Sequence, residues 1–223
     1  MQMETDDKDR VRMNTPRKSR LTVAAEILSV AFHPIFMPLY GLLIIYSSPT
    51  LLSFIPAGLK KMIFILAVTN NVMLPLALAA VLWTRGAITT FNARDRNERV
   101  LLLTFALLMY TLSAGLLMKM QVPLLFRAYF ISLAVVTLIT LIITSFYMIS
   151  LHAAGIGGLI ALIVFMIILY DIRTVWQLVT VIMAGGAVMS SRLWLNGHTP
   201  TEVWTGLFTG AATMALSLLL LLK

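Results

Sequence analysis

Three polar clusters interrupt an otherwise apolar chain, and their residue types are suited to binding and cleaving phosphate esters. The most informative cluster contains Arg192, His198 and Glu202. Arg192 offers a planar, permanently charged fork that can hold two phosphate oxygens at once. His198 can attack phosphorus through one ring nitrogen while the Glu202 carboxylate accepts the N–H of the other nitrogen. This combination indicates phosphoryl transfer through a phosphohistidine, a scheme that requires neither a metal ion nor a cofactor.

A second cluster, Ser150-Leu151-His152, can supply two further groups for such a reaction. Ser150 precedes an apolar helical run, so its hydroxyl and the following backbone N–H groups would form an anion site at a helix N-terminus. His152 could donate the proton that the leaving alkoxide needs, after which water would hydrolyse the phosphohistidine. We therefore expect Ser150 to bind phosphate and His152 to act as an acid.

The remaining cluster is the polar segment 92–99, in which several arginines precede an apolar run. Arg99 is its candidate phosphate ligand, and Arg94 or Arg96 is the alternative. The whole segment can also be interpreted as a solvated, positively charged connection between spans. Its assignment is therefore less specific than that of the other two clusters.

The elements that must position these clusters are transmembrane helices. Of the 223 residues, 60% are apolar and only 12% are charged, which is far outside the usual range for soluble globular domains. We predict an all-α, polytopic membrane bundle of six or seven transmembrane helices in one domain, residues 25–223, after a disordered basic tail at residues 1–24. The apolar stretches run at about 27–46, 61–84, 100–118, 125–147, 153–170, 174–190 and 203–222.

The first apolar stretch leaves the number of spans open. Pro34 and Pro38 would break a regular helix beside His33 and give an interfacial or re-entrant piece. His33 itself is more typical of a structural role than of catalysis. Seven spans would put the clusters on the side of the basic tail, which the positive-inside rule places in the cytoplasm, whereas six would put them on the other side.

An even number of expected spans separates each cluster from the next. Two spans lie between Arg99 and Ser150, and two more lie between His152 and Ser191. An even number of crossings returns the chain to the same face of the membrane, whatever the first stretch does. The sequence therefore predicts that all three clusters can meet in one site.

Composition and local patterns also exclude several functional classes. The formal net charge of +8 is divided among short loops and one tail, so we expect no nucleic-acid partner. Cysteine is absent, which excludes disulfide and thiolate chemistry. Small residues cluster within the spans, as in Gly157-Gly158 and Gly206 with Gly210. They favour close helix contact, because no lysine follows them in the pattern of a phosphate-binding loop.

The third cluster resembles a motif of the type 2 phosphatidic acid phosphatase superfamily, membrane lipid phosphatases related to bacterial acid phosphatases and vanadium haloperoxidases. That motif is Ser-Arg, five residues, His, three residues, Asp. This chain has Ser191-Arg192, five residues, His198, three residues and Glu202. The spacing is the same, and glutamate stands where the family has aspartate.

The other two clusters match the family only in part. Ser150 and His152 correspond to the serine and histidine of the family's Pro-Ser-Gly-His motif, while its proline and glycine are missing. Arg99 could supply the arginine of the motif Lys, six residues, Arg-Pro. Asn92 and Val100 replace the lysine and the proline of that motif. The order of the three clusters along the chain agrees with that of the family.

The resemblance implies an integral membrane enzyme that hydrolyses a phosphate ester of a membrane lipid through a phosphohistidine. Phosphatidic acid, phosphatidylglycerol phosphate, polyprenyl pyrophosphate and phosphorylated lipid A are the substrates it would allow. The expected location is a cell membrane, the bacterial inner membrane, and the oligomeric state is left open. The implied catalytic residues are His198, His152 and Glu202, and the implied phosphate-binding residues are Arg192, Ser150, Ser191 and Arg99.

Other interpretations of these residues stay open. The segment 199–202 is also a capping box at a helix start, so Glu202 could cap the last helix. A relative that binds anionic headgroups without turnover would account for the departures from the family motifs. A phosphotransferase is chemically adjacent to a phosphatase. A transporter or channel is a further candidate because Asn70, Asn71 and Pro75 share one span, although they are more typical of hydrogen bonds between helices.

Overall fold

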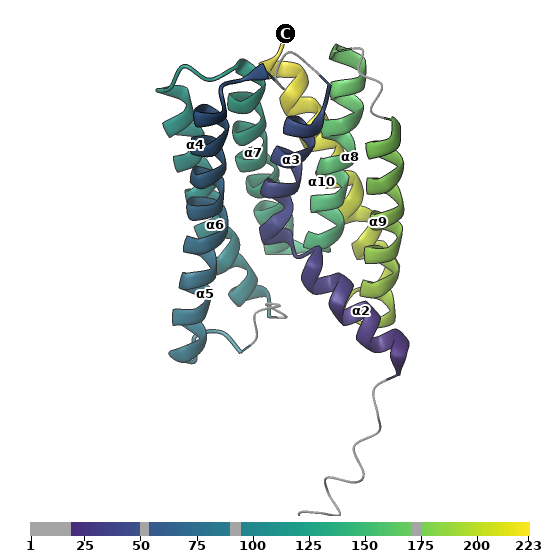
Figure 1. Cartoon of the computed structure of the whole chain (residues 1–223). Helices are drawn as coiled ribbons and strands as arrows, with labels where there is room; N and C mark the ends of the chain where they lie inside the picture. Colours follow the sequence, from purple (N-terminus) through teal and green to yellow (C-terminus); the bar gives the residue numbers. More distant parts are fainter. Residues whose placement is uncertain (1–18, 50–53, 90–94, 171–174) are drawn as a thin grey trace, which may run out of the picture.

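The protein forms a bundle of helices that run side by side (Figure 1). A computed structural model describes residues 19–49, 54–89, 95–170 and 175–223, and these ranges contain helices and no strands. Each of the seven predicted apolar stretches coincides with a helical segment. The elements are α2 (Arg20–Ala31), the 3-10 helix η1 (Pro34–Phe36), α3 (Met37–Ser47), α4 (Ala57–Val68), the π-helical η3 (Thr69–Met73), α5 (Leu74–Thr84), α6 (Arg96–Met118), α7 (Leu124–Phe146), α8 (Leu151–Tyr170), α9 (Val175–Trp194) and α10 (Pro200–Leu221).

Six helical segments of the described chain are long and apolar enough to cross a membrane. Two of them are composite: residues 20–47 join α2, η1 and α3, and residues 57–84 join α4, η3 and α5. The others are α6, α7, α8 and α10. Large apolar side chains such as Ile168, Phe208 and Leu220 are exposed on the outside of the bundle, as expected of surfaces that face lipid. These features indicate a multi-pass membrane protein.

The first segment runs the full length of the bundle although its helix is interrupted. At one end the Trp194 indole N–H donates to the Thr22 hydroxyl at 3.4 Å, and at the other the Gln177 amide donates to the Ser47 hydroxyl at 2.9 Å. Because residues 177 and 194 lie near opposite ends of α9, α2 and α3 together run antiparallel to it. The described chain therefore passes along the bundle seven times, and six of these passes are long and apolar enough to cross a membrane. The pass made by α9 is the one outside the six most apolar segments.

The interruption between α2 and α3 follows from a missing proline N–H. Pro34 cannot donate to the carbonyl of Val30 as a helix requires, and the N–H of His33 donates to that carbonyl instead, at 3.2 Å. The carbonyl of Ser29, whose helical partner His33 would have been, is then left for another donor. His152 of α8 takes this place, with Nε2 at 3.0 Å from the Ser29 oxygen. The helix break predicted from the prolines is confirmed.

The start of α3 is anchored to the core by Tyr129 of α7. Its buried hydroxyl donates to the carbonyl of Pro38 at 3.0 Å and to that of Met37 at 3.3 Å. A Cβ placed on Gly41 would overlap the Tyr129 hydroxyl, so only glycine permits this close approach. The break in the first segment is therefore held in place by a residue of the protein interior.

The predicted tail, residues 1–24, extends too far into the chain. Residues 1–18 lie outside the described residues, but residues 20–24 belong to α2. Ser19 is the N-cap of this helix, because its hydroxyl accepts the N–H of Thr22 at 3.1 Å. Ser19 and Arg20, whose polar side chains suggested that they belong to the tail, are thus the N-cap and the first residue of a helix.

Helices α8 and α10 approach so closely that their backbones touch. A Cβ on Gly210 would overlap the carbonyl of Ala154, and a Cβ on Gly157 would overlap the backbone of α10. At the start of both helices, a Cβ on Gly206 would lie 2.5 Å from the carbonyl oxygen of Ser150. The expected packing role of these small residues is confirmed. It brings the first turns of α8 and α10 together.

We predict that Gly210→Ala destabilises the protein by about 1–3 kcal/mol, because the added methyl group forces two backbones apart. Gly115→Ala in α6 is the matched control, since a Cβ there meets nothing within 4 Å, and removing a helical glycine should stabilise slightly. Thermal unfolding of the detergent-solubilised variants, followed by circular dichroism, checks both. Equal midpoints for the two variants would show that the contact between α8 and α10 can accept an added methyl group without loss of stability.

Candidate functional site

Residues of all three sequence clusters line one cavity of about 400 Å³. Arg99 comes from the first turn of α6, His152 from the start of α8, Arg192 from the end of α9, and His198 from the loop before α10. The remaining lining is largely apolar and comes from η1, α3, α5, α6, α7 and α8. Its members include Pro38, Leu76, Leu103, Phe105, Ala106, Leu133, Val136 and Gly155. The cavity therefore has a basic end, where the clusters meet, and an apolar interior.

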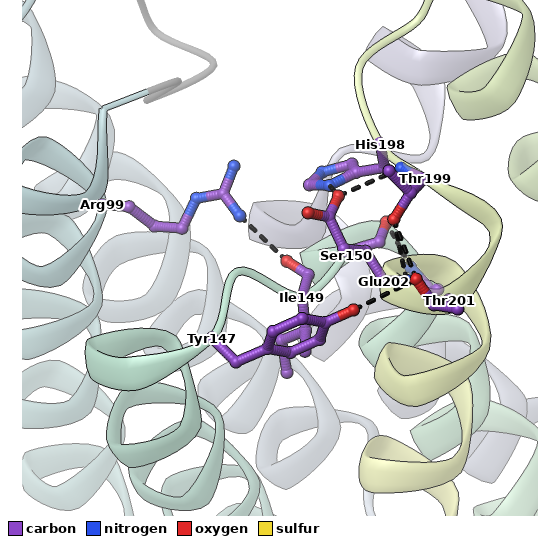
Figure 2. A network of polar contacts seen from close by, with 9 residues as sticks. Arg99, Tyr147, Ile149, Ser150, His198, Thr199, Thr201 and Glu202 are labelled. Atoms are coloured by element: carbon purple, nitrogen blue, oxygen red, sulfur yellow. Dashed lines mark hydrogen bonds and ion pairs between the residues drawn. The ribbon is translucent and has the colours of Figure 1, made fainter.

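His198 and Glu202 form the closest ionisable pair at the basic end. His198 Nδ1 lies 2.8 Å from Glu202 Oε2, and the His198 side chain is only 4% exposed. A carboxylate can only accept, so Nδ1 carries the hydrogen and Nε2 carries the lone pair of the neutral ring. Since His198 also lines the cavity, this tautomer provides an oriented nucleophile (Figure 2).

Glu202 also caps α10, so both roles considered for it are present at once. Its Oε2 accepts the N–H of Thr199 at 3.1 Å, and its own N–H donates to the Thr199 hydroxyl at 3.3 Å. This reciprocal pair is the capping box that the sequence predicts at 199–202. The same Oε2 contacts His198. The helix cap therefore fixes the carboxylate that orients the imidazole.

Burial lowers the pKa of His198 below its ordinary value of 6.5. The hydrogen bond and charge of Glu202 oppose this effect, while the positive charges of Arg99 and Arg192 add to it. The net direction is downward, so the ring is neutral at pH 7. A neutral ring is the form in which Nε2 can act as a nucleophile.

The second cluster is held between the other two by backbone contacts (Figure 2). Arg99 Nη1 donates to the carbonyl of Ile149 at 2.9 Å, and the N–H of Ser150 donates to the carbonyl of Glu202 at 3.1 Å. The Ser150 hydroxyl accepts the N–H of Ala153 at 3.4 Å, which places it at the N-terminus of α8 as predicted. The first turns of α6, α8 and α10 are thereby joined.

Arg99 is the arginine of the first cluster that reaches the cavity. It is 4% exposed, whereas Arg96, the first residue of the same turn, is exposed to solvent. Arg94 lies outside the described residues. Asp95 caps α6 by accepting the N–H of Asn97 at 2.9 Å, and this sets the rotation of the first turn. Arg99 belongs to the motif that matches the family least well, and the tertiary structure nevertheless brings it to the cavity with the other clusters.

The loop after α9 folds back over Arg192. The N–H of Gly197 donates to the carbonyl of Arg192 at 3.1 Å, and Asn196 has a positive φ of 50°. A Cβ on Gly197 would lie 2.7 Å from Nη2 of Arg192, so this glycine covers the guanidinium. Arg192 is 8% exposed and acts electrostatically on Arg99 and His198. Two permanent cations thus act on one imidazole.

Ser191 is placed differently from the candidate arginines and histidines, all of which line the cavity. Its hydroxyl donates to the carbonyl of Ala187 at 2.7 Å, within α9. Neither Ser191 nor the fully buried Ser150 is among the described residues that line the cavity. The phosphate-binding roles of both serines stay predictions from the sequence.

His33 is the residue of this cavity that sequence reasoning assigned to structure alone. Its ring lies 5.6 Å from that of His152, centroid to centroid, at an interplanar angle of 82°. Both rings line the cavity together with Arg192 and His198. A histidine next to two prolines in an apolar span was the available signal, but the sequence does not show that residues 33 and 152 meet.

Comparison of the chain with protein-family models gives no match, and neither do comparisons with curated proteins and with solved structures. The functional assignment therefore rests on the residues of the site, their spacing and their geometry. The resemblance to type 2 phosphatidic acid phosphatases stays an interpretation of the sequence.

We predict that Glu202→Gln lowers the pKa of His198 further, because the carboxylate stabilises the imidazolium and the amide does not. The amide oxygen can still accept the N–H of Thr199, which limits the effect on the helix cap. A pH titration of the imidazole NMR signals in detergent micelles measures the pKa, and His198→Asn identifies the signal by its loss. An unchanged or raised pKa would contradict the orientation of His198 by Glu202.

Proposed function

We propose that this protein is a membrane phosphatase that hydrolyses the phosphate monoester of a lipid through a phosphohistidine on His198. The observation that supports this most strongly is the cavity, which combines two buried arginines and an oriented imidazole with an apolar interior. A lipid phosphate has the same division, with a dianionic headgroup and an apolar chain. The headgroup would lie between Arg99 and Arg192, and the chain would follow the apolar lining.

Phosphate binding and charge stabilisation fall to the two arginines and the start of α8. Arg99 and Arg192 stay charged at any physiological pH, and burial strengthens their interaction with an anion. Ser150 places its hydroxyl at the positive end of α8. Phosphoryl transfer depends on such positioned charges, because negative charge stays on the phosphoryl oxygens as the bonds change.

The first chemical step transfers the phosphoryl group to the protein. The Nε2 lone pair of His198 attacks phosphorus, and the bond between phosphorus and the lipid oxygen breaks. The bound phosphate dianion favours uptake of a solvent proton at Nδ1 of His152, and His152 then gives this proton to the leaving oxygen. The Ser29 carbonyl can only accept a hydrogen bond, so Nε2 of His152 keeps its hydrogen and Nδ1 is the nitrogen that exchanges protons. Glu202 stabilises the positive charge that develops on His198.

The second step restores the enzyme. Water attacks phosphorus and transfers a proton to Nδ1 of His152, and the bond from phosphorus to Nε2 of His198 breaks. Inorganic phosphate leaves, and His198 is again neutral at Nε2. The protons balance over the two steps, because His152 first gives one and then takes one. No metal ion takes part in this scheme.

The substrate and its location follow from the lipid character of the site. Substrate would enter the cavity by lateral diffusion in a cell membrane, for which we propose the bacterial inner membrane. Phosphatidic acid, phosphatidylglycerol phosphate and polyprenyl pyrophosphate are the substrates to test first.

The polar side chains that suggested a transport pathway form hydrogen bonds with another helix. Asn70 Nδ2 donates to the Ser113 hydroxyl at 3.4 Å, and that hydroxyl donates to Asn71 at 2.8 Å.

A protein that binds lipid phosphates without cleaving them is the second candidate. The position of Ser191 favours it, since the hydroxyl is used inside α9 rather than in the cavity. Such a protein would retain headgroup affinity through Arg99 and Arg192 and would release no phosphate.

We predict that His198→Ala and His198→Asn each lower phosphate release by at least about a thousandfold. The asparagine amide can still donate to Glu202 but cannot form a phosphohistidine, so it separates loss of the nucleophile from loss of the helix cap. Phosphate is measured with detergent-purified protein, a panel of lipid phosphates and a chelator. Release by the variants at the wild-type rate would overturn the role of His198. Binding without release by wild type would favour the second candidate.

We predict that Arg99→Ala raises the KM for the lipid phosphate by roughly 10- to 100-fold. This factor corresponds to the free energy of a hydrogen bond between charged groups. Arg96→Ala is the matched control, because Arg96 lies in the same turn and carries the same charge but is exposed to solvent. It should change KM less than about threefold. Similar effects of the two substitutions would show that only the general positive charge of this membrane face matters.

A further inference from the structure

His33 occupies a position in the cavity for which the proposed reaction has no role. It follows the last turn of α2, at the break that Pro34 creates, and its side chain lines the cavity with His152, Arg192 and His198. Its ring is held in a defined orientation, because Nδ1 accepts the N–H of Ile35 at 3.3 Å and so caps η1. The break therefore places an imidazole beside the expected headgroup.

The contact with Ile35 determines which nitrogen of His33 is available to a ligand. An atom that accepts an N–H must carry a lone pair, so Nδ1 of His33 is unprotonated and Nε2 carries the hydrogen. Within the described residues, Nδ1 is the only atom of this ring that takes part in a hydrogen bond. Protonation at Nδ1 would break the bond to Ile35. His33 is thus a neutral donor with one N–H left.

The neighbouring His152 is held in the complementary way. Its Nε2 contacts the carbonyl of Ser29 at 3.0 Å, which leaves Nδ1 for exchange of a proton. Ser29 and Ile35 flank the same break, and the two rings meet edge to face at 5.6 Å. One segment, residues 29–35, therefore anchors both imidazoles, through Nδ1 of His33 and through Nε2 of His152, and the other nitrogen of each ring takes no part in these contacts.

We propose that His33 is a substrate-binding residue whose Nε2–H donates to an oxygen of the phosphate headgroup. The dianion of a phosphate monoester offers acceptors and no donors, which matches a ring that can only donate at Nε2. A neutral donor also adds binding without bringing a further positive charge next to Arg192. This inference rests on the proposed function for the identity of the ligand, but binding can be measured whether or not the ligand is cleaved.

Two substitutions separate the capping role of His33 from the donor role. In His33→Asn the side-chain oxygen can take the place of Nδ1 and accept the N–H of Ile35, as asparagine does at N-caps, but nothing reaches the position of Nε2. In His33→Gln the amide N–H approximates Nε2, while the cap is lost. A purely structural histidine would tolerate asparagine better than glutamine. A headgroup-binding histidine would show the opposite order.

The experiment measures binding of short-chain phosphatidic acid by isothermal titration calorimetry, with the full chain in detergent. All variants carry His198→Asn, so that the probe is not consumed. We expect His33→Asn to weaken binding by roughly 10- to 100-fold without lowering the thermal midpoint. We expect His33→Gln to bind within about threefold of the parent and to melt at a lower temperature, since the loss of a cap destabilises.

Each outcome decides at least one of the two proposals. Binding by His33→Asn at the parent's affinity would overturn the donor role of His33 and leave the phosphatase proposal standing. The expected crossover, together with no phosphate release by wild type, would overturn the phosphatase proposal and support a binding protein that uses His33. Failure of the parent to bind the probe at all would overturn both. Inorganic phosphate as a second probe shows whether the headgroup alone is recognised.

Discussion

Direct backbone contact between α8 and α10 is the constraint on which the site depends. Gly157, Gly206 and Gly210 leave no room for side chains between the two helices, so α10 begins against the start of α8. The N–H of Ser150 then reaches the carbonyl of Glu202. Two groups from distant parts of the chain are thereby fixed to each other through main-chain atoms, which move less than side chains do. Small residues achieve this inside a membrane, where close packing rather than water drives helix association.

Unpaired backbone groups provide the second organising force. In an apolar environment a carbonyl without a donor is costly, and the prolines of the first segment create such groups. His152 supplies the missing hydrogen bond to the Ser29 carbonyl at 3.0 Å, and Tyr129 donates to the carbonyl of Pro38 at the start of α3 at 3.0 Å. The break is therefore stabilised by side chains of α7 and α8. One of these side chains, His152, is thereby oriented within the cavity. The break in the first segment therefore helps to set the geometry of the proposed active site, because it provides the carbonyl that orients His152.

The carboxylate of Glu202 acts electrostatically on both Arg99 and His198 at the basic end of the cavity. Glu202 caps α10, accepts from Thr199 and orients His198 with the same oxygen. Arg99 and Arg192 place two permanent positive charges in a buried setting. An anion bound between them would be attracted to both charges. This electrostatic arrangement supports the proposed phosphate site.

The sequence by itself determined the helical membrane architecture, the break at Pro34 and the pairing of His198 with Glu202. Each of these features has a local cause. They are long apolar stretches, a proline that lacks an N–H, and a separation of four residues between His198, just before a helix, and Glu202 in its first turn. Tertiary structure alone decided that His33 meets His152, that Arg99 rather than Arg96 reaches the cavity, and that Ser191 bonds within its own helix. In a soluble protein the alternation of polar and apolar residues shows which face of a helix is buried. Here lipid and protein interior are both apolar, so that pattern is missing, and only packing between helices settles which side chains face each other.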